Sequence, residues 1–155
     1  MTATPAAAAP VTVLVLNGPN LNRLGTRDPD VYGNGSLEDL RAALTADALP
    51  GVRIDLRQTN DEGELIGWLH DAIDSRSPVI LNPAAFTHYS YALRDAAAML
   101  TQAGILLVEV HLSNPHAREE FRHTSVISAV ATGVIAGFGF DSYLLALALI
   151  AKRLG

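Results

Sequence analysis

Apolar and polar positions along the chain follow two patterns, short apolar runs and longer stretches with an apolar residue every three or four positions. The first pattern is typical of buried strands and the second of helices with one buried face. Strands are predicted at residues 11–16, 52–56, 78–81, 105–110 and 133–138. Helices are predicted to begin at Ser36 and Asn60 and to cover residues 89–102 and 141–153. This alternation predicts an α/β fold, a flavodoxin-like doubly wound domain with a five-stranded parallel sheet in the order 2-1-3-4-5.

The two ends of the chain differ from the rest in composition. Residues 1–10 are mostly Ala, Thr and Pro without a positive charge or an apolar run, so they predict a disordered tail rather than a secretion signal. Residues 11–155 have the length of a single catalytic domain with one core. The apolar stretch 126–151 carries one charge, Asp141, and three glycines divide it, which favours a strand and a helix over a membrane span. We therefore expect no membrane partner.

Composition and charge exclude several functional classes. A net charge of −5 without a basic run argues against a nucleic-acid partner. The absence of cysteine excludes disulfides, thiol nucleophiles and cysteine-ligated metals, and it fits a reducing cytoplasm. The only lysine, Lys152, lies near the C-terminus, so we expect no Schiff-base chemistry. A mean hydropathy of +0.22 indicates a large buried sheet, a surface covered by sister subunits, or both.

Unusual polar residues follow three of the predicted strands. Asn17 ends the first strand, Asn82 ends the third, and Glu109 and His111 end the fourth. In a doubly wound fold, ligands bind beyond the carboxyl ends of the strands, near the point where the strand order reverses. These residues therefore predict a crevice at that edge of the sheet.

The loop at residues 17–33 is long for a connection between a strand and a helix. It carries Arg23, Arg27 and Tyr32. It is either a surface loop or a lid that brings arginine and tyrosine over a pocket.

Glu109 and His111 are two positions apart in a strand, so their side chains share a face. A buried carboxylate can fix the tautomer of an imidazole and favour its charged form, although a purely structural pair has the same pattern. The spacing of His111, His116 and His123 matches no common metal-ligand pattern, so no metal site is predicted.

Ser113, Asn114 and Pro115 are typical of the start of a helix, where free backbone N–H groups can bind an anion. Arg118 and Arg122 would follow one helical turn apart. They either bind a carboxylate beside the crevice or pair with neighbouring glutamates on an exposed helix.

Four motifs together resemble the type II dehydroquinases over residues 11–154. They are NGPNLNRLGTRDPDVYG from residue 17, QTNDEGELIGWLHDA from residue 58, LNPAAFTHYSYALRDA from residue 81 and EVHLSNPHAREEFRHTS from residue 109. The resemblance implies dehydration of 3-dehydroquinate to 3-dehydroshikimate by anti elimination through an enolate, with side chains alone and no cofactor. It also implies a cytoplasmic homododecamer built as a tetramer of trimers, with a small anionic substrate as its ligand.

The resemblance assigns catalytic roles to five residues. Tyr32 would be the base that removes a proton beside the ketone, and Arg27 would hold it as phenolate. Asn20 would position a water that stabilises the enolate. His111, oriented by Glu109, would protonate the departing hydroxyl.

The resemblance also assigns substrate contacts. Asn82, His88 and Arg122 would bind substrate hydroxyls, the backbone of Leu112 and Ser113 would bind the carboxylate, and Asp95 would reach into the site of a neighbouring subunit. The chain departs from the family pattern where Ala84 and Ala85 replace glycines that many relatives have, which could narrow the pocket.

The chemistry sets a requirement for the base. Tyrosine ordinarily has a pKa near ~10, so a tyrosine that acts near pH 7 needs its phenolate stabilised by roughly 4 kcal/mol. One or two nearby guanidinium groups, for which Arg23 and Arg27 are the candidates in the loop, can supply such a shift.

Other functions fit the same fold class. A response-regulator domain needs carboxylates after the first and third strands, where this chain has Asn17 and Asn82. A flavodoxin-like binding module needs a phosphate loop, but Pro19 removes one backbone N–H and no glycine-rich motif follows. An inactive relative that only assembles is the third alternative. A biosynthetic and a quinate-degrading role both remain open.

Overall fold

The computed structural model describes residues 2–3, 9–26 and 28–155. Its centre is a five-stranded parallel sheet in the order β2-β1-β3-β4-β5, which confirms the predicted α/β class and strand order. The strands are β1 (Val11–Asn17), β2 (Val52–Gln58), β3 (Val79–Asn82), β4 (Leu107–His111) and β5 (Gly133–Ala136). The predicted strands differ from these bounds by one or two residues at most of their ends.

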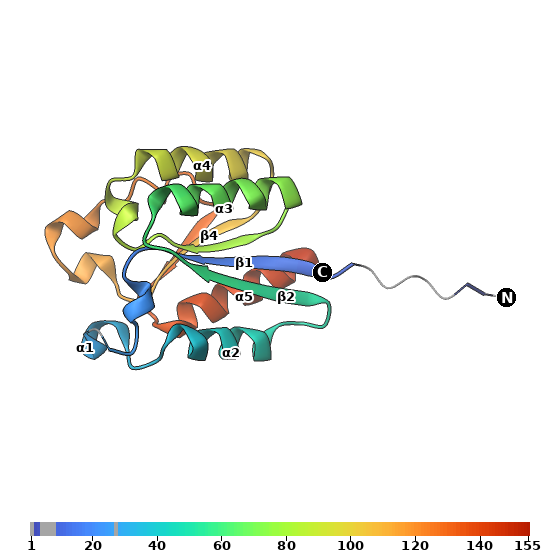
Figure 1. Ribbon diagram of the computed structural model, residues 1–155, viewed down its shortest axis with the longest axis horizontal. Helices are drawn as coiled ribbons and strands as arrows, with labels where there is room; N and C mark the ends of the chain where they lie inside the picture. The colour runs from blue at the N-terminus through green and yellow to red at the C-terminus, as the bar shows by residue number, and fades with distance from the viewer. Residues whose placement is uncertain (1, 4–8, 27) are drawn as a thin grey trace.

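Helices cover both faces of the sheet (Figure 1). One face carries α3 (Glu62–Ser75) and α4 (Tyr91–Gln102), and the other carries α2 (Leu37–Asp47) and α5 (Phe140–Leu154). The apolar stretch before the C-terminus is thus a strand and a helix, as predicted. Within the described part of the chain, no helix has the length and apolar character needed to cross a bilayer.

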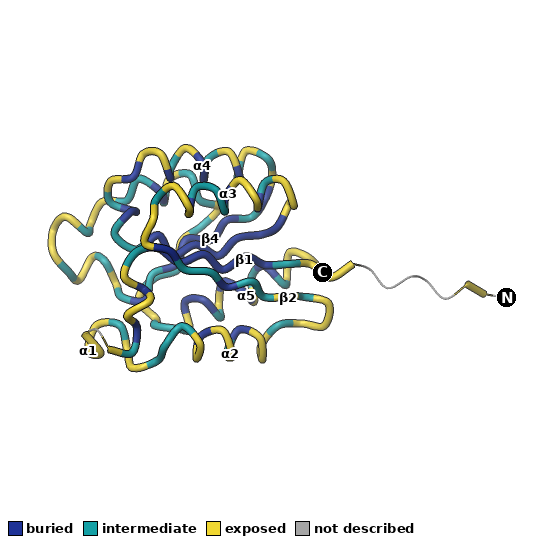
Figure 2. The backbone as a smooth tube through the Cα atoms, viewed as in Figure 1, coloured by how far each residue is buried: buried dark blue, intermediate teal, exposed yellow. Residues whose placement is uncertain are grey.

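Strand β1 shows why the sheet has two cores. Val13 and Val15 belong to the apolar cluster under α2 and α5, whereas Leu14 and Leu16 belong to the cluster under α3 and α4. All four residues are buried, and the tube of β1 has the colour of buried residues over much of its length (Figure 2). Because successive side chains of a strand point to opposite faces, a central strand of this fold carries apolar residues on both faces.

The helix starts follow the capping residues of the sequence. Ser36 and Asp39 form a complete capping box before α2, in which each side chain accepts a hydrogen bond from the other residue's backbone N–H. Asp61 caps α3 and Ser90 caps α4 by accepting a hydrogen bond from the backbone N–H of Glu64 and Leu93, respectively. The third predicted helix therefore begins at residue 91, two residues later than expected.

Five short helical segments complete the fold. They are η1 (Leu21–Arg23) and α1 (Pro29–Tyr32) in the first loop, η2 (Ala84–His88) after β3, and η3 (Pro115–Ala117) and η4 (Glu120–His123) after β4.

The predicted helix after Ser113 is wrong in extent. Asn114 does cap a turn, but η3 ends after three residues and Arg118 adopts an extended backbone conformation. Tertiary contacts explain the early end, because the extended backbone lets the Arg118 side chain reach the long loop after β1. No long helix therefore presents its N-terminus to the crevice at this point.

Candidate active site

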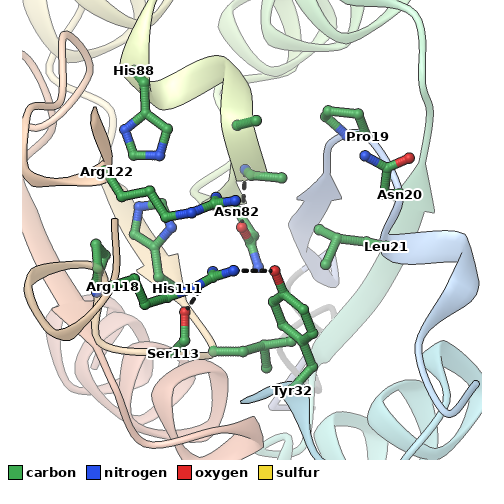
Figure 3. Close-up of a pocket in the computed structure, with 14 residues that line it drawn as sticks. Pro19, Asn20, Leu21, Tyr32, Asn82, His88, His111, Ser113, Arg118 and Arg122 are labelled. Atoms are coloured by element: carbon green, nitrogen blue, oxygen red, sulfur yellow. Dashed lines mark hydrogen bonds between the residues drawn. The ribbon is translucent and has the colours of Figure 1, made fainter. Parts of the chain in front are cut away.

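A pocket opens at the carboxyl ends of β1, β3 and β4, at the edge of the sheet where the sequence predicted a crevice (Figure 3). It is lined by Pro19, Asn20, Leu21, Tyr32, Asn82, Ala84, Ala85, His88, His111, Leu112, Ser113, Pro115, Arg118 and Arg122. Eight of the eleven residues that the sequence assigned to catalysis or substrate binding are among them.

Tyr32 lies at the end of α1 and meets an arginine from the other side of the pocket. Arg118 donates a hydrogen bond of 2.9 Å from Nη2 to the Tyr32 phenol oxygen and one of 3.2 Å from Nη1 to Ser113 Oγ. Its guanidinium carbon lies 5.1 Å from the centre of the Tyr32 ring. A cation in this position stabilises negative charge on the phenol oxygen.

Sequence reasoning proposed other arginines for this contact. Arg23 is exposed in η1 and does not line the pocket, whereas Arg27 lies outside the described residues. The sequence offered two roles for Arg118, as a carboxylate ligand or as an ion-pair partner of neighbouring glutamates. No sequence signal joins it to a tyrosine 86 positions earlier, because the contact depends on where β4 and the first loop meet in space.

His111, at the end of β4, forms a close pair with Glu109. Its Nε2 lies 2.6 Å from Glu109 Oε2, so Nδ1 is the ring nitrogen that remains for a ligand in the pocket. Glu109 is fully buried, and its carboxylate also accepts hydrogen bonds from Thr87 Oγ1 (3.1 Å) and Ser128 Oγ (2.8 Å). Burial opposes ionisation, but the bonds from His111, Ser128 and Thr87 outweigh it and hold the pKa of Glu109 below its ordinary value.

Asn20 lies in the turn after β1 with a left-handed backbone conformation (φ 70°). Its backbone N–H donates to Asn60 Oδ1 at 2.9 Å, and Gln58 Nε2 donates to Asn60 Oδ1 and to the Gly18 carbonyl. The end of β2 therefore holds this turn in place. The sequence analysis placed Gln58 in a motif and Asn60 at the start of a helix, but it gave neither residue a role in the site.

Gly18 in the same turn allows the loops after β1 and β3 to approach closely. A Cβ at this position would lie 2.6 Å from the Pro83 carbonyl oxygen, which is a severe clash. Glycine is therefore required for the two strand ends to meet at the pocket.

Asn82 and His88 face the pocket from β3 and η2. Asn82 Oδ1 accepts from the Ala84 backbone N–H at 3.1 Å, and Asn82 Nδ2 donates to Tyr143 Oη at 2.8 Å. His88 Nδ1 lies 2.8 Å from the Thr124 carbonyl, which can only accept. Nδ1 of His88 therefore carries the proton, and in the neutral ring Nε2 is left as an acceptor.

The remaining predicted residues divide into two groups. Leu112, Ser113 and Arg122 line the pocket, and Arg122 also pairs with Glu119. Asp95 does not line it; its side chain is 75% exposed on α4 and pairs with Arg94 at 3.1 Å. Lys152, in the last turn of α5, does not line the pocket either.

Ala84 and Ala85 both line the pocket, and Ala84 has a left-handed backbone conformation with φ 51°. An L-residue with a Cβ atom pays about 1–2 kcal/mol for that conformation. The strain lies directly beside Asn82, whose Oδ1 accepts from the Ala84 N–H.

Within the described residues, no three His, Asp or Glu side chains come together as a group that could hold a metal ion. The side chains that line the pocket include a phenol with its arginine, an imidazole with its carboxylate, two side-chain amides, and the polar groups of His88, Ser113 and Arg122.

Comparisons with known proteins agree with this geometry. The family described as Dehydroquinase class II matches residues 11–151. The chain is 59% identical over 143 residues to a 3-dehydroquinate dehydratase of Salinispora tropica, covering 91% of this chain and 97% of that protein. It is 58% identical over 142 residues to that of Kineococcus radiotolerans, covering 91% and 95%. The crystal structure of a type II dehydroquinase from Propionibacterium acnes superposes with a TM-score of 0.87 at 48% identity, covering 93% of this chain and 98% of that one.

Proposed function

Because the chain belongs to the class II dehydroquinase family, we propose that it is a hydro-lyase that converts 3-dehydroquinate to 3-dehydroshikimate and water. The observation that carries the proposal is the presence in one pocket of a tyrosine supported by a guanidinium and a histidine supported by a buried carboxylate. These are the base and the acid that a β-elimination needs. Neither the inactive relative nor the flavodoxin-like binding module is favoured.

Tyr32 is the base in this proposal. Its phenolate takes a proton from the carbon beside the ketone, and the electrons of the broken C–H bond form an enolate. The hydrogen bond from Arg118 supports the charged phenolate before that step. Arg27, as the family resemblance implies, would add a second positive charge from the same loop.

The enolate then expels the hydroxyl. A water held by Asn20 stabilises the negative oxygen of the enolate. His111 donates a proton to the departing hydroxyl, so that the C–O bond breaks, the C=C bond forms and water leaves. Glu109 orients His111 and stabilises its charged form. Since Tyr32 comes from α1 and His111 from β4, base and acid can act on opposite faces of the ring, which is an anti elimination.

The other lining groups bind the substrate. Asn82, His88 and Arg122 contact its hydroxyls, and the backbone N–H groups of Leu112 and Ser113 receive its carboxylate. Each role is compatible with the hydrogen bonds that these residues already make.

We further propose that the enzyme works as a homo-oligomer, a dodecamer built as a tetramer of trimers, in the cytoplasm. Large apolar side chains support the assembly, because Tyr91, Phe121 and Phe138 are 70%, 58% and 64% exposed. Asp95 from a neighbouring subunit would then complete the pocket. Residues 11–155 would form the catalytic domain, and the tail predicted for residues 1–10 lies mostly outside the described residues.

The decisive experiment follows ultraviolet absorbance during incubation with 3-dehydroquinate, because the product is a conjugated enone. We expect a growing signal that neither a metal chelator nor borohydride reduces, since neither a metal nor an imine is involved. Tyr32→Phe should abolish the signal while leaving the fold and the assembly intact. A folded, assembled wild-type protein without any signal would refute the proposed function, and near-normal turnover by Tyr32→Phe would refute the assignment of the base.

A further inference from the structure

Tyr143 is a fully buried tyrosine of α5 that joins the carboxyl ends of two strands. Its hydroxyl donates to Asn17 Oδ1 at 2.7 Å, at the end of β1, and accepts from Asn82 Nδ2 at 2.8 Å, at the end of β3. The exposed fractions of Tyr143, Asn17 and Asn82 are 0%, 0% and 3%. Burial raises the pKa of the Tyr143 phenol far above its ordinary value, so the group stays a neutral hydroxyl.

The direction of each hydrogen bond between Asn17, Tyr143 and Asn82 is determined by the partners of Asn17. Asn17 Nδ2 lies 3.0 Å from the Arg57 carbonyl and 3.3 Å from the Val15 carbonyl, and both of these oxygens can only accept. The amide of Asn17 must therefore turn its nitrogen toward them and its oxygen toward Tyr143. Since an amide oxygen cannot donate, the Tyr143 proton lies on the bond to Asn17.

The Tyr143 oxygen then has only lone pairs to offer on its other side. It requires a donor there, so Asn82 must turn Nδ2 toward it. The Ala84 backbone N–H sets the same orientation independently, because it donates to Asn82 Oδ1. A flipped Asn82 would place oxygen against oxygen at Tyr143 and nitrogen against nitrogen at Ala84, and each buried mismatch is costly.

We propose that Tyr143 is a positioning residue that fixes the amide orientation of Asn82, so that Asn82 meets the substrate as a hydrogen-bond donor. This inference rests on the proposed function, in which Asn82 binds a substrate hydroxyl. One N–H of Asn82 is bound to Tyr143, and among the described residues the other N–H has no hydrogen-bond partner. Because Asn82 lines the pocket, the free N–H is the group that a hydroxyl oxygen of the substrate would meet.

A double-mutant cycle tests this link. Tyr143→Phe keeps the ring and removes only the hydroxyl, so Asn82 loses the partner that fixes its nitrogen. We expect the KM for 3-dehydroquinate to rise about tenfold, the size expected for a lost hydrogen bond of roughly 1.4 kcal/mol, with a smaller change in kcat. In an Asn82→Ala background, the same change should alter KM by less than about twofold, since no amide is left to orient.

An equal rise in KM in both backgrounds would overturn the proposal, because it would mean that Tyr143 acts through general stability. Tyr89→Phe is the matched control, since it also removes one tyrosine hydroxyl but from a side chain that is 57% exposed and does not line the pocket. It should leave KM and kcat unchanged. Wild-type turnover distinguishes failure of the proposed function from failure of this inference. If the wild-type protein shows no activity, the proposed function is refuted. If it is active but the effects of the two substitutions on KM are additive, only the inference about Tyr143 is refuted.

If Tyr143→Phe does not fold, Asn82→Asp tests whether Asn82 acts as a hydrogen-bond donor to the substrate. The substitution keeps the oxygen that accepts from Ala84 and replaces the donor nitrogen by an acceptor. We expect KM to rise at least as much as in Asn82→Ala. A KM close to the wild-type value would show that Asn82 serves the substrate as an acceptor and would overturn the proposal.

Discussion

Arg118 donates a hydrogen bond of 2.9 Å to the phenol oxygen of Tyr32, although 86 positions separate the two residues in the chain. The contact joins the segment after β4 to the long loop after β1. Arg118 also holds Ser113 Oγ, so one guanidinium supports the proposed base and anchors the segment proposed to bind the substrate carboxylate.

Replacing this arginine should impair catalysis strongly. Arg118→Ala removes a charged hydrogen bond worth about 1.5–3 kcal/mol, so we expect kcat/KM to fall by roughly 10- to 100-fold. Steady-state kinetics with 3-dehydroquinate measure the effect. Arg23→Ala, which removes an exposed arginine outside the pocket, should change kcat/KM by less than about twofold. Equal effects of the two variants would contradict a specific role for Arg118.

The turn that carries Asn20 should depend on Asn60. Asn60→Ala removes the acceptor for the Asn20 backbone N–H, so the turn loosens and kcat/KM should fall by about two- to tenfold, as expected for a lost hydrogen bond worth about 0.5–1.5 kcal/mol. Asn60→Asp keeps an oxygen at the same place and should retain most of the activity. A loss of the same size in both variants would show that the amide nitrogen of Asn60, rather than its oxygen, holds the turn.

Glu109 should make the folded state sensitive to acid. Its pKa in the folded protein lies below the ordinary value of 4.5, so folding favours the ionised form. The resulting stability is fully present above about pH 4.5 and is lost as the pH falls from there through the lowered pKa.

Glu109→Gln should flatten this dependence. Urea unfolding at pH 7 and at pH 4 should show a smaller loss of unfolding free energy for Glu109→Gln than for wild type. Glu64→Gln, at an exposed position of α3, should keep the wild-type difference. An identical pH dependence in Glu109→Gln would mean that other groups cause the acid sensitivity.

Ala84→Gly should relieve backbone strain. Glycine adopts φ 51° freely, which recovers about 1–2 kcal/mol, while the added freedom of the unfolded chain costs about 0.4–1 kcal/mol. We therefore expect a net gain of up to about 1 kcal/mol in the free energy of unfolding, measured by denaturant titration. Ala85→Gly, the adjacent residue without positive φ, should instead destabilise the fold by roughly 0.5–1 kcal/mol.

The fold and most of the site could be predicted from the sequence for identifiable reasons. Apolar runs define the five strands, and the polar residues Asn17, Asn82 and His111 interrupt them where each strand ends. The carboxyl ends of parallel strands meet at one edge of the sheet, so these positions alone locate the pocket.

The parts that could not be predicted depend on contacts between distant segments. The residues after Asn114 have helical capping signals, yet η3 ends after three residues because Arg118 is drawn toward Tyr32. Tyr143 has an ordinary place on the apolar face of a helix, and only the folded structure shows its hydroxyl between two asparagines. Local sequence patterns carry no information about such partners.

The apolar character of β1 on both faces has a consequence for how the sheet assembles. If β1 slid by one residue along β3, Val15 and Leu16 would exchange cores, and the burial of apolar surface would change little. Hydrophobicity alone therefore does not select the native alignment. Asn17 selects the native alignment, because only there does it lie opposite Asn82, so that both side chains can form a hydrogen bond with the Tyr143 hydroxyl. A misaligned sheet would bury amides without partners at a cost of about 1–3 kcal/mol for each group. The polar end of the strand therefore raises the free energy of misaligned sheets and favours the native alignment during folding.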